Sequence, residues 1–127
     1  MINALMKSVL EQDRSPIVLC DLNHTIVYMN PTAAKRYEKQ GGWELVGKSL
    51  KACHNEKSNA MIDKIIDWFK DSKSNNMICT FKNMTENKDV YMVALRDESG
   101  NVIGYYEKHE YRTPESANVY DFSQSLI

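Results

Sequence analysis

The fold is decided by the stretch DVYMVALRDESGNVIGYYEKHEY, residues 89–111. Two runs rich in β-branched and aromatic residues, 90–95 and 102–107, flank a short polar segment, which is the sequence form of a β-hairpin. Gly100 is the residue of that segment that adopts positive φ without steric cost, so we expect it to close the turn. Both runs are too apolar to lie in water, so at least one face must pack. The stretch therefore predicts two long strands at the centre of an antiparallel sheet.

Length and composition limit the class of protein. A chain of 127 residues fits one domain and can bury a moderate core. It has 16 Lys and Arg against 17 Asp and Glu, evenly spread, so the basic stripe of a nucleic-acid-binding protein is missing. No apolar run approaches the roughly 20 residues that span a bilayer, and the N-terminus lacks a signal-peptide pattern. Three scattered cysteines fit reduced thiols. We expect a cytoplasmic protein with no nucleic-acid or membrane partner.

The N-terminal segment predicts an amphipathic helix that is stopped by Ser15-Pro16. A helix this short is marginal alone and needs a surface to lie on. That surface is either its own sheet or the same helix of a second copy, and we expect a homodimer through this helix. Its apolar stripe consists of Ile2, Leu5, Met6, Val9 and Leu10.

The middle of the chain supplies the other elements of the sheet and its cover. Strands are expected at 17–20, 26–29 and 77–81, with short helices from Asn30 and a longer helix after Cys53-His54. Because strands at both ends of the chain must share one sheet, the helices between them are expected to cover one face. The prediction is an α+β fold with a five-stranded antiparallel sheet, helices on one face and an N-terminal flanking helix.

Three segments in this order resemble the PAS family. They are the hairpin from Ile17 to Asn30 with NPTAA following at 30–34, ELVGKSL at 44–50, and RDESGNVIG at 96–104. One departure is EYRT at 110–113, where many family members read Asp-Ile-Thr before an output helix. The resemblance implies a flanking helix at 1–14, a PAS domain at 15–112 and a tail at 113–127.

The resemblance also implies a function. PAS domains are sensory or protein-interaction modules in which the sheet and helices enclose a pocket. They signal through dimer or partner-protein contacts, and they bind haem, flavins, small organic ligands or nothing. We therefore expect a signalling module with no catalysis of its own and an unknown ligand. A fragment of a larger regulator is an alternative.

Cys53-His54 is the most suggestive pair of residues for cofactor chemistry. In one interpretation His54 is the axial ligand of a non-covalent haem in a redox or gas sensor; in the other, Cys53 is a buried thiol and His54 bonds loop backbone. Covalent c-type haem is not expected, because Leu50 stands where a second cysteine is needed. A LOV-type flavin adduct is not expected either, because the equivalent segment is GKSL at 47–50 rather than Asn-Cys-Arg-Phe-Leu.

We also predict a partly apolar pocket between the long helix and the sheet, although ordinary core would give the same pattern. His24 lies in a predicted turn and is expected to be solvated. The residues expected to border the pocket and bind a cofactor are Tyr28, Cys53, His54, Ile62, Phe69, Met77 and Tyr91.

Overall fold

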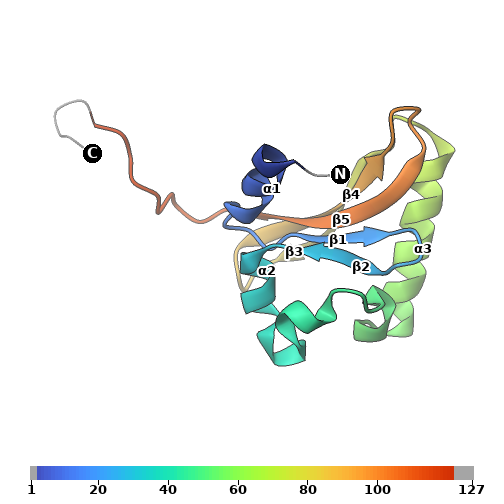
Figure 1. Cartoon of the computed structure of the whole chain (residues 1–127), viewed down its shortest axis with the longest axis horizontal. Helices are drawn as coiled ribbons and strands as arrows, with labels where there is room; N and C mark the ends of the chain where they lie inside the picture. The colour runs from blue at the N-terminus through green and yellow to red at the C-terminus, as the bar shows by residue number, and fades with distance from the viewer. Residues whose placement is uncertain (1–2, 122–127) are drawn as a thin grey trace.

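The computed structural model describes residues 3–121 and has the predicted fold: a five-stranded antiparallel sheet with helices (Figure 1). The helices are α1 (Ala4–Glu11), α2 (Pro31–Arg36) and α3 (Glu56–Asp71), with 3-10 turns at Glu38–Gln40, Gly42–Leu45 and Leu50–Cys53. The strands are β1 (Val18–Asp21), β2 (Ile26–Met29), β3 (Met77–Asn83), β4 (Lys88–Arg96) and β5 (Val102–Tyr111).

The strand order across the sheet is β2-β1-β5-β4-β3, so the last strand of the chain lies in the middle. The hairpin of β4 and β5 turns at Gly100, whose φ of 85° confirms the predicted role of this glycine. On its other side β5 pairs with β1, where Gly104 faces Asp21. A Cβ atom at Gly104 would overlap the backbone carbonyl oxygen of Cys20, so only glycine permits this close approach of the two strands.

The core lies between one face of the sheet, here called the inner face, and the helices after β2. Helix α3 follows the expected 3.6-residue period and buries four side chains, whereas Met61 beside them is exposed. The buried side chains of α3 are Ile62, Ile65, Ile66 and Phe69. They pack with inner-face residues such as Cys20, Met92 and Tyr105.

Asn30 connects the start of the domain to its first covering helix. Its side chain caps α2 by accepting a hydrogen bond from the Ala33 N–H, and the same oxygen accepts from the Ile17 N–H. Its amide nitrogen donates to the backbone carbonyls of Leu10 and Ser15. Because the side chain is fully buried, these bonds fix how the chain leaves α1 and enters β1.

Helix α1 lies apart from α3 and touches the outer face of the sheet near β2 (Figure 1), where the Tyr28 hydroxyl donates to Glu11. Leu5, Met6 and Val9 stay exposed, at 80, 59 and 67%. Ile2, which was assigned to the same stripe, lies outside the described residues. Residues 113–121 lead away from the body of the domain. Leu5, Met6 and Val9 of the apolar stripe are therefore not covered by the described part of this chain.

Candidate functional site

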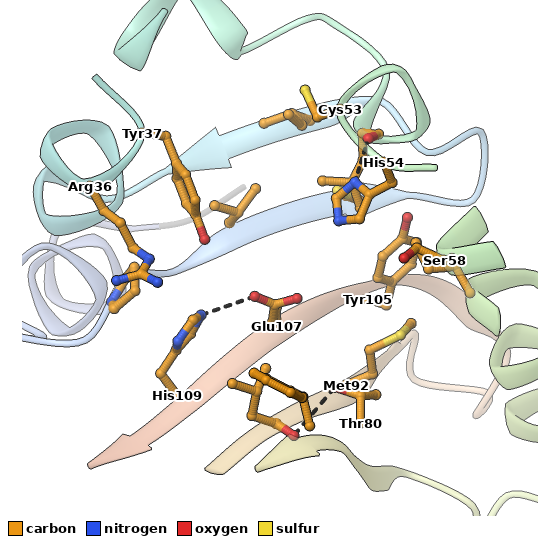
Figure 2. Close-up of a pocket in the computed structure, with 18 of the residues that line it drawn as sticks. Arg36, Tyr37, Cys53, His54, Ser58, Thr80, Met92, Tyr105, Glu107 and His109 are labelled. Carbon is orange, nitrogen blue, oxygen red and sulfur yellow. Dashed lines mark hydrogen bonds and ion pairs between the residues drawn. The ribbon is translucent and has the colours of Figure 1, made fainter. Parts of the chain in front are cut away.

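The site is a cavity of about 470 Å³ between the inner face of the sheet and the covering helices (Figure 2). This volume is within the usual range of small-molecule pockets. The apolar part of the lining comes from strands and helices far apart in the sequence, so it exists only in the folded chain. It includes Ile26, Met29, Leu45, Ile62 and Met92.

The opposite part of the lining is polar, because the inner face of β4 and β5 changes character along the strands. Register places Met92 opposite Glu107, Val90 opposite His109, and Lys88 opposite Tyr111. Alternate residues of a strand share a face. On the inner face of β4, apolar Met92 and Val90 are therefore followed by charged Lys88 at the start of the strand. The cavity therefore has an apolar end and a charged end, and the charged end comprises Arg36, Asn83, Lys88, Glu107 and His109.

Glu107 and His109 form an ion pair at the charged end, with 3.0 Å between Oε1 and Nε2 (Figure 2). Burial raises the pKa of Glu107, but the hydrogen bond and charge of His109, together with the charges of His54 and Lys88, outweigh burial, and the pKa lies below its ordinary value. The Glu107 side chain is 43% accessible because it faces the cavity. It is therefore a charged group that a ligand can reach.

Glu86 organises the cations of this end. It accepts hydrogen bonds from both Arg36 amino groups, at 2.8 and 3.0 Å, and from the Asn83 amide at 2.9 Å. The Arg36 hydrogen bond is the main cause that lowers the pKa of Glu86 to about 2. Lys88 Nζ lies 3.5 Å from the same carboxylate. Two cations thus share one carboxylate.

Tyr105 and Cys20 line the cavity nearer to β1, and His24 packs beside them. The Tyr105 hydroxyl and His24 Nδ1 are 2.7 Å apart, and His24 Nε2 lies 3.5 Å from Asp63. The expectation that His24 is solvated is wrong, because positive φ at His24 turns its ring onto Tyr105. Burial, followed by the charge of Lys51, lowers the pKa of His24. Burial raises the pKa of the Cys20 thiol to about 11 and also raises that of Tyr105.

Cys53 and His54 are exposed residues of the lining, at the entry to α3. The His54 ring bonds through Nδ1 to the Leu50 carbonyl at 3.0 Å, as expected for a histidine that bonds loop backbone (Figure 2). The expectation that Cys53 is a buried thiol is wrong, because the 3-10 turn leaves its side chain in water.

The residues predicted to border the pocket fall into two groups. Cys53, His54 and Ile62 line the cavity. The others do not line it. Phe69 is in the core behind the cavity, and Met77 is half exposed on the edge strand β3.

Tyr28 and Tyr91 point to the outer face, where they contact Glu11 and Arg112. In each case the neighbour along the strand, Met29 or Met92, takes the inner position. The sequence reasoning missed the whole charged end. The available signal was the alternation of polar residues in β5, which puts Glu107 and His109 on the face of buried Tyr105.

Two kinds of feature are absent from residues 3–121. No three His, Cys, Asp or Glu side chains among them are grouped so that they could hold a metal ion. No helix in the same range has the length and apolar character needed to cross a bilayer.

Several solved structures share this fold. The C-terminal domain of a Streptococcus mutans protein superposes with a TM-score of 0.62 at 19% identity, over 82% of this chain and 80% of that one. The PAS domain of a Colwellia psychrerythraea protein gives 0.61 at 12% identity, over 83% and 92%. The Aer2 receptor of Vibrio cholerae, a dual PAS-heme oxygen sensor, gives 0.54 at 17%, over 78% and 95%.

At these low identities, the structural matches establish a shared fold but do not indicate a shared ligand. No curated protein matches the sequence. The family model of the PAS domain, by contrast, matches residues 6–109, which is most of the chain. This match covers all of the cavity lining and every helix and strand except the first two residues of α1 and the last two of β5. The chain therefore belongs to the PAS domain family, whose members are sensory modules in signalling.

Proposed function

We propose that this chain is a sensory module that binds a small organic ligand in its cavity and passes the signal on through dimer or partner-protein contacts. The observation that carries the proposal is the cavity itself, about 470 Å³ with an apolar end and a charged end. A core that served stability alone would fill such a space with side chains. It would also exclude charged groups from its walls.

The position of β5 gives a route by which a bound ligand can alter the rest of the domain. Its inner-face residues Tyr105, Glu107 and His109 line the cavity. The same strand pairs with both β1 and β4, so a shift of β5 would move the centre of the sheet. Strand β1 continues into the hairpin that contacts α1. Ligand contacts and α1 are thus connected by paired strands.

The apolar stripe of α1 is the surface that we assign to the homodimer. Leu5, Met6 and Val9 are exposed together, and burial of side chains of this size stabilises by about 1.5–3 kcal/mol each. Pairing of the same helix from two copies around a two-fold axis would bury both stripes at once. In a dimer of this kind α1, which contacts the hairpin of β1 and β2, lies directly at the interface.

A second candidate function is non-covalent haem binding through His54. One contact favours it: Nδ1–H donates to the Leu50 carbonyl, which orients the ring and leaves Nε2 at the cavity wall without a hydrogen-bond partner among residues 3–121. Haem would supply redox or gas-binding chemistry there. Haem titration of the chain and of His54→Ala tests this candidate. A spectrum that stays that of free haem, or uptake that is equal in both, contradicts it.

The main proposal is tested by screening small organic compounds for stabilisation of the purified chain, with an absorption spectrum taken first. Ser58→Trp places an indole in the cavity wall and should abolish the stabilisation by every hit. Asp67→Trp, on an exposed position of the same helix outside the cavity lining, should leave it unchanged. Compounds that still stabilise the Ser58→Trp variant, or a screen in which no compound stabilises the chain, would contradict ligand binding in this cavity.

A further inference from the structure

Lys88 is a buried cation whose hydrogen-bonding capacity is not used. Its side chain is 1% exposed, and its ammonium nitrogen has no hydrogen-bond partner among residues 3–121. The Tyr111 ring lies beneath it, with 5.3 Å between Nζ and the ring centroid. An ammonium group has three donors, and leaving them unpaired away from water is costly. Lys88 lines the cavity, so a ligand can supply the missing acceptor.

The neighbouring carboxylate supplies an opposite charge but no hydrogen bond. Glu86 lies 3.5 Å from Lys88 Nζ, but its two oxygens already accept three hydrogen bonds from Arg36 and Asn83. Arg36 and Lys88 together carry two positive charges against the single negative charge of Glu86. These three residues therefore carry one positive charge in excess, while the Glu107 carboxylate lies on the same wall beside His109.

His109 adds a second unused nitrogen on the same face. Its Nε2 faces Glu107 at 3.0 Å, whereas its Nδ1 is buried and has no hydrogen-bond partner in the described chain. Register places Lys88 and His109 diagonally across β4 and β5, a spacing at which side chains of this length reach a common ligand. In the imidazolium form Nδ1 is also a donor. Figure 2 shows the ring at the charged end, beside Glu107.

We propose that the cavity selects ligands that carry one carboxylate on an apolar body, with the carboxylate bound by Lys88 and the body lying among Ile26, Ile62 and Met92. A carboxylate matches the single excess charge of the Arg36, Glu86 and Lys88 cluster. A phosphate would bring a second negative charge toward Glu107, which like-charge repulsion opposes. The apolar end then contributes burial of the body.

This inference rests on the proposed ligand-binding function, and the experiment separates the two. Calorimetric titration of the chain with two matched pairs of probes is the test: octanoate and octanamide, and 3-phenylpropionate and its amide. At least one acid should bind ten or more times more tightly than its amide. Lys88→Met should remove that preference and leave binding of the amide unchanged or tighter. Lys108→Met, on the outer face of the next strand, should change neither.

The thermal stability of Lys88→Met without ligand is a second readout. Because the variant removes a buried ammonium group whose donors make no hydrogen bond among residues 3–121, its melting temperature should equal or exceed that of the original chain. An amide that binds as well as its acid, or an acid whose affinity survives Lys88→Met, would overturn the carboxylate inference while ligand binding itself stands. If none of the four probes binds, both the carboxylate inference and the assignment of the cavity as the binding site of these probes are contradicted. The comparison of acid with amide needs no variant, so it decides even if Lys88→Met does not fold.

Discussion

The side-chain oxygen of Asn30 accepts a hydrogen bond of 2.9 Å from the backbone N–H of Ile17. The same oxygen caps α2 at Ala33, so one buried amide holds the first strand and the first covering helix together. Asn30→Ala should lower the free energy of unfolding by about 2 kcal/mol or more, because it leaves buried backbone groups without partners.

Urea denaturation measures this loss. Asn55→Ala is the matched control, since Asn55 also caps a helix but is exposed, and its side chain bonds only the Ser58 N–H among the described contacts. That variant should lose about 1 kcal/mol or less. Equal losses in the two variants would show that the other side-chain bonds of Asn30, including the bond to Ile17, contribute no stability beyond that of a helix cap.

Gly100 adopts a φ of 85° in the turn between β4 and β5. Gly100→Val should lower the free energy of unfolding by on the order of 1 kcal/mol or more, because a β-branched side chain is strained in this region. Gly100→Asn should lose less, since asparagine tolerates positive φ better than other residues with a side chain. Denaturation of both variants gives the comparison, and a valine variant as stable as the asparagine variant would remove backbone strain as the explanation.

The Arg36–Glu86 pair predicts a dependence of stability on acid pH. Because the pKa of Glu86 is lowered to about 2 in the folded chain, the contribution of the pair is fully present above about 4.5, the ordinary pKa. It is lost as the pH falls from about 4.5 to about 2. Glu86 is 37% exposed, so solvent screening limits the effect to about 1 kcal/mol.

The measurement is the difference in unfolding free energy between the original chain and Arg36→Met from pH 7 to pH 2. The difference should shrink across the acid range. In a Glu86→Gln background the same substitution should give a difference that does not vary with pH. A constant difference in the original background would contradict the assignment of the low pKa to this pair.

The stripe on α1 predicts how the chain self-associates. Light scattering should show a dimer for the intact chain and a monomer for Leu5→Glu with Val9→Glu, because two buried carboxylates per helix oppose pairing. Lys7→Glu with Ser8→Glu places the same side chains beside the stripe and should weaken the dimer less. A monomer in every sample would mean that no dimer forms, and a dimer in every sample would mean that another surface holds it.

Local sequence determined the order and kind of the elements. The hairpin around Gly100, the short helix that follows Asn30 and the longer helix after His54 each depend on residues close together in the chain, and each is present as predicted. Strands at both ends of the sequence, with helices between them, then allow few arrangements other than one covered sheet.

Tertiary structure alone decided which side chains face the cavity. In β4 the run from Val90 to Leu95 is apolar at every position, so its alternation does not show whether Tyr91 or Met92 points inward, and a shift of one residue exchanges the faces. The structure turns Met92 inward and Tyr91 outward.

The polar groups in and around the cavity depend on still longer-range contacts. Arg36 reaches Glu86 across 50 residues, and His24 meets Tyr105 across 81. From sequence alone a charged or polar residue is expected to lie in water, because its burial is favourable only when a partner lies beside it. Those partners come from elements far apart in the chain, so the sequence determined the sheet and its helices, and only their packing decided the chemistry of the cavity.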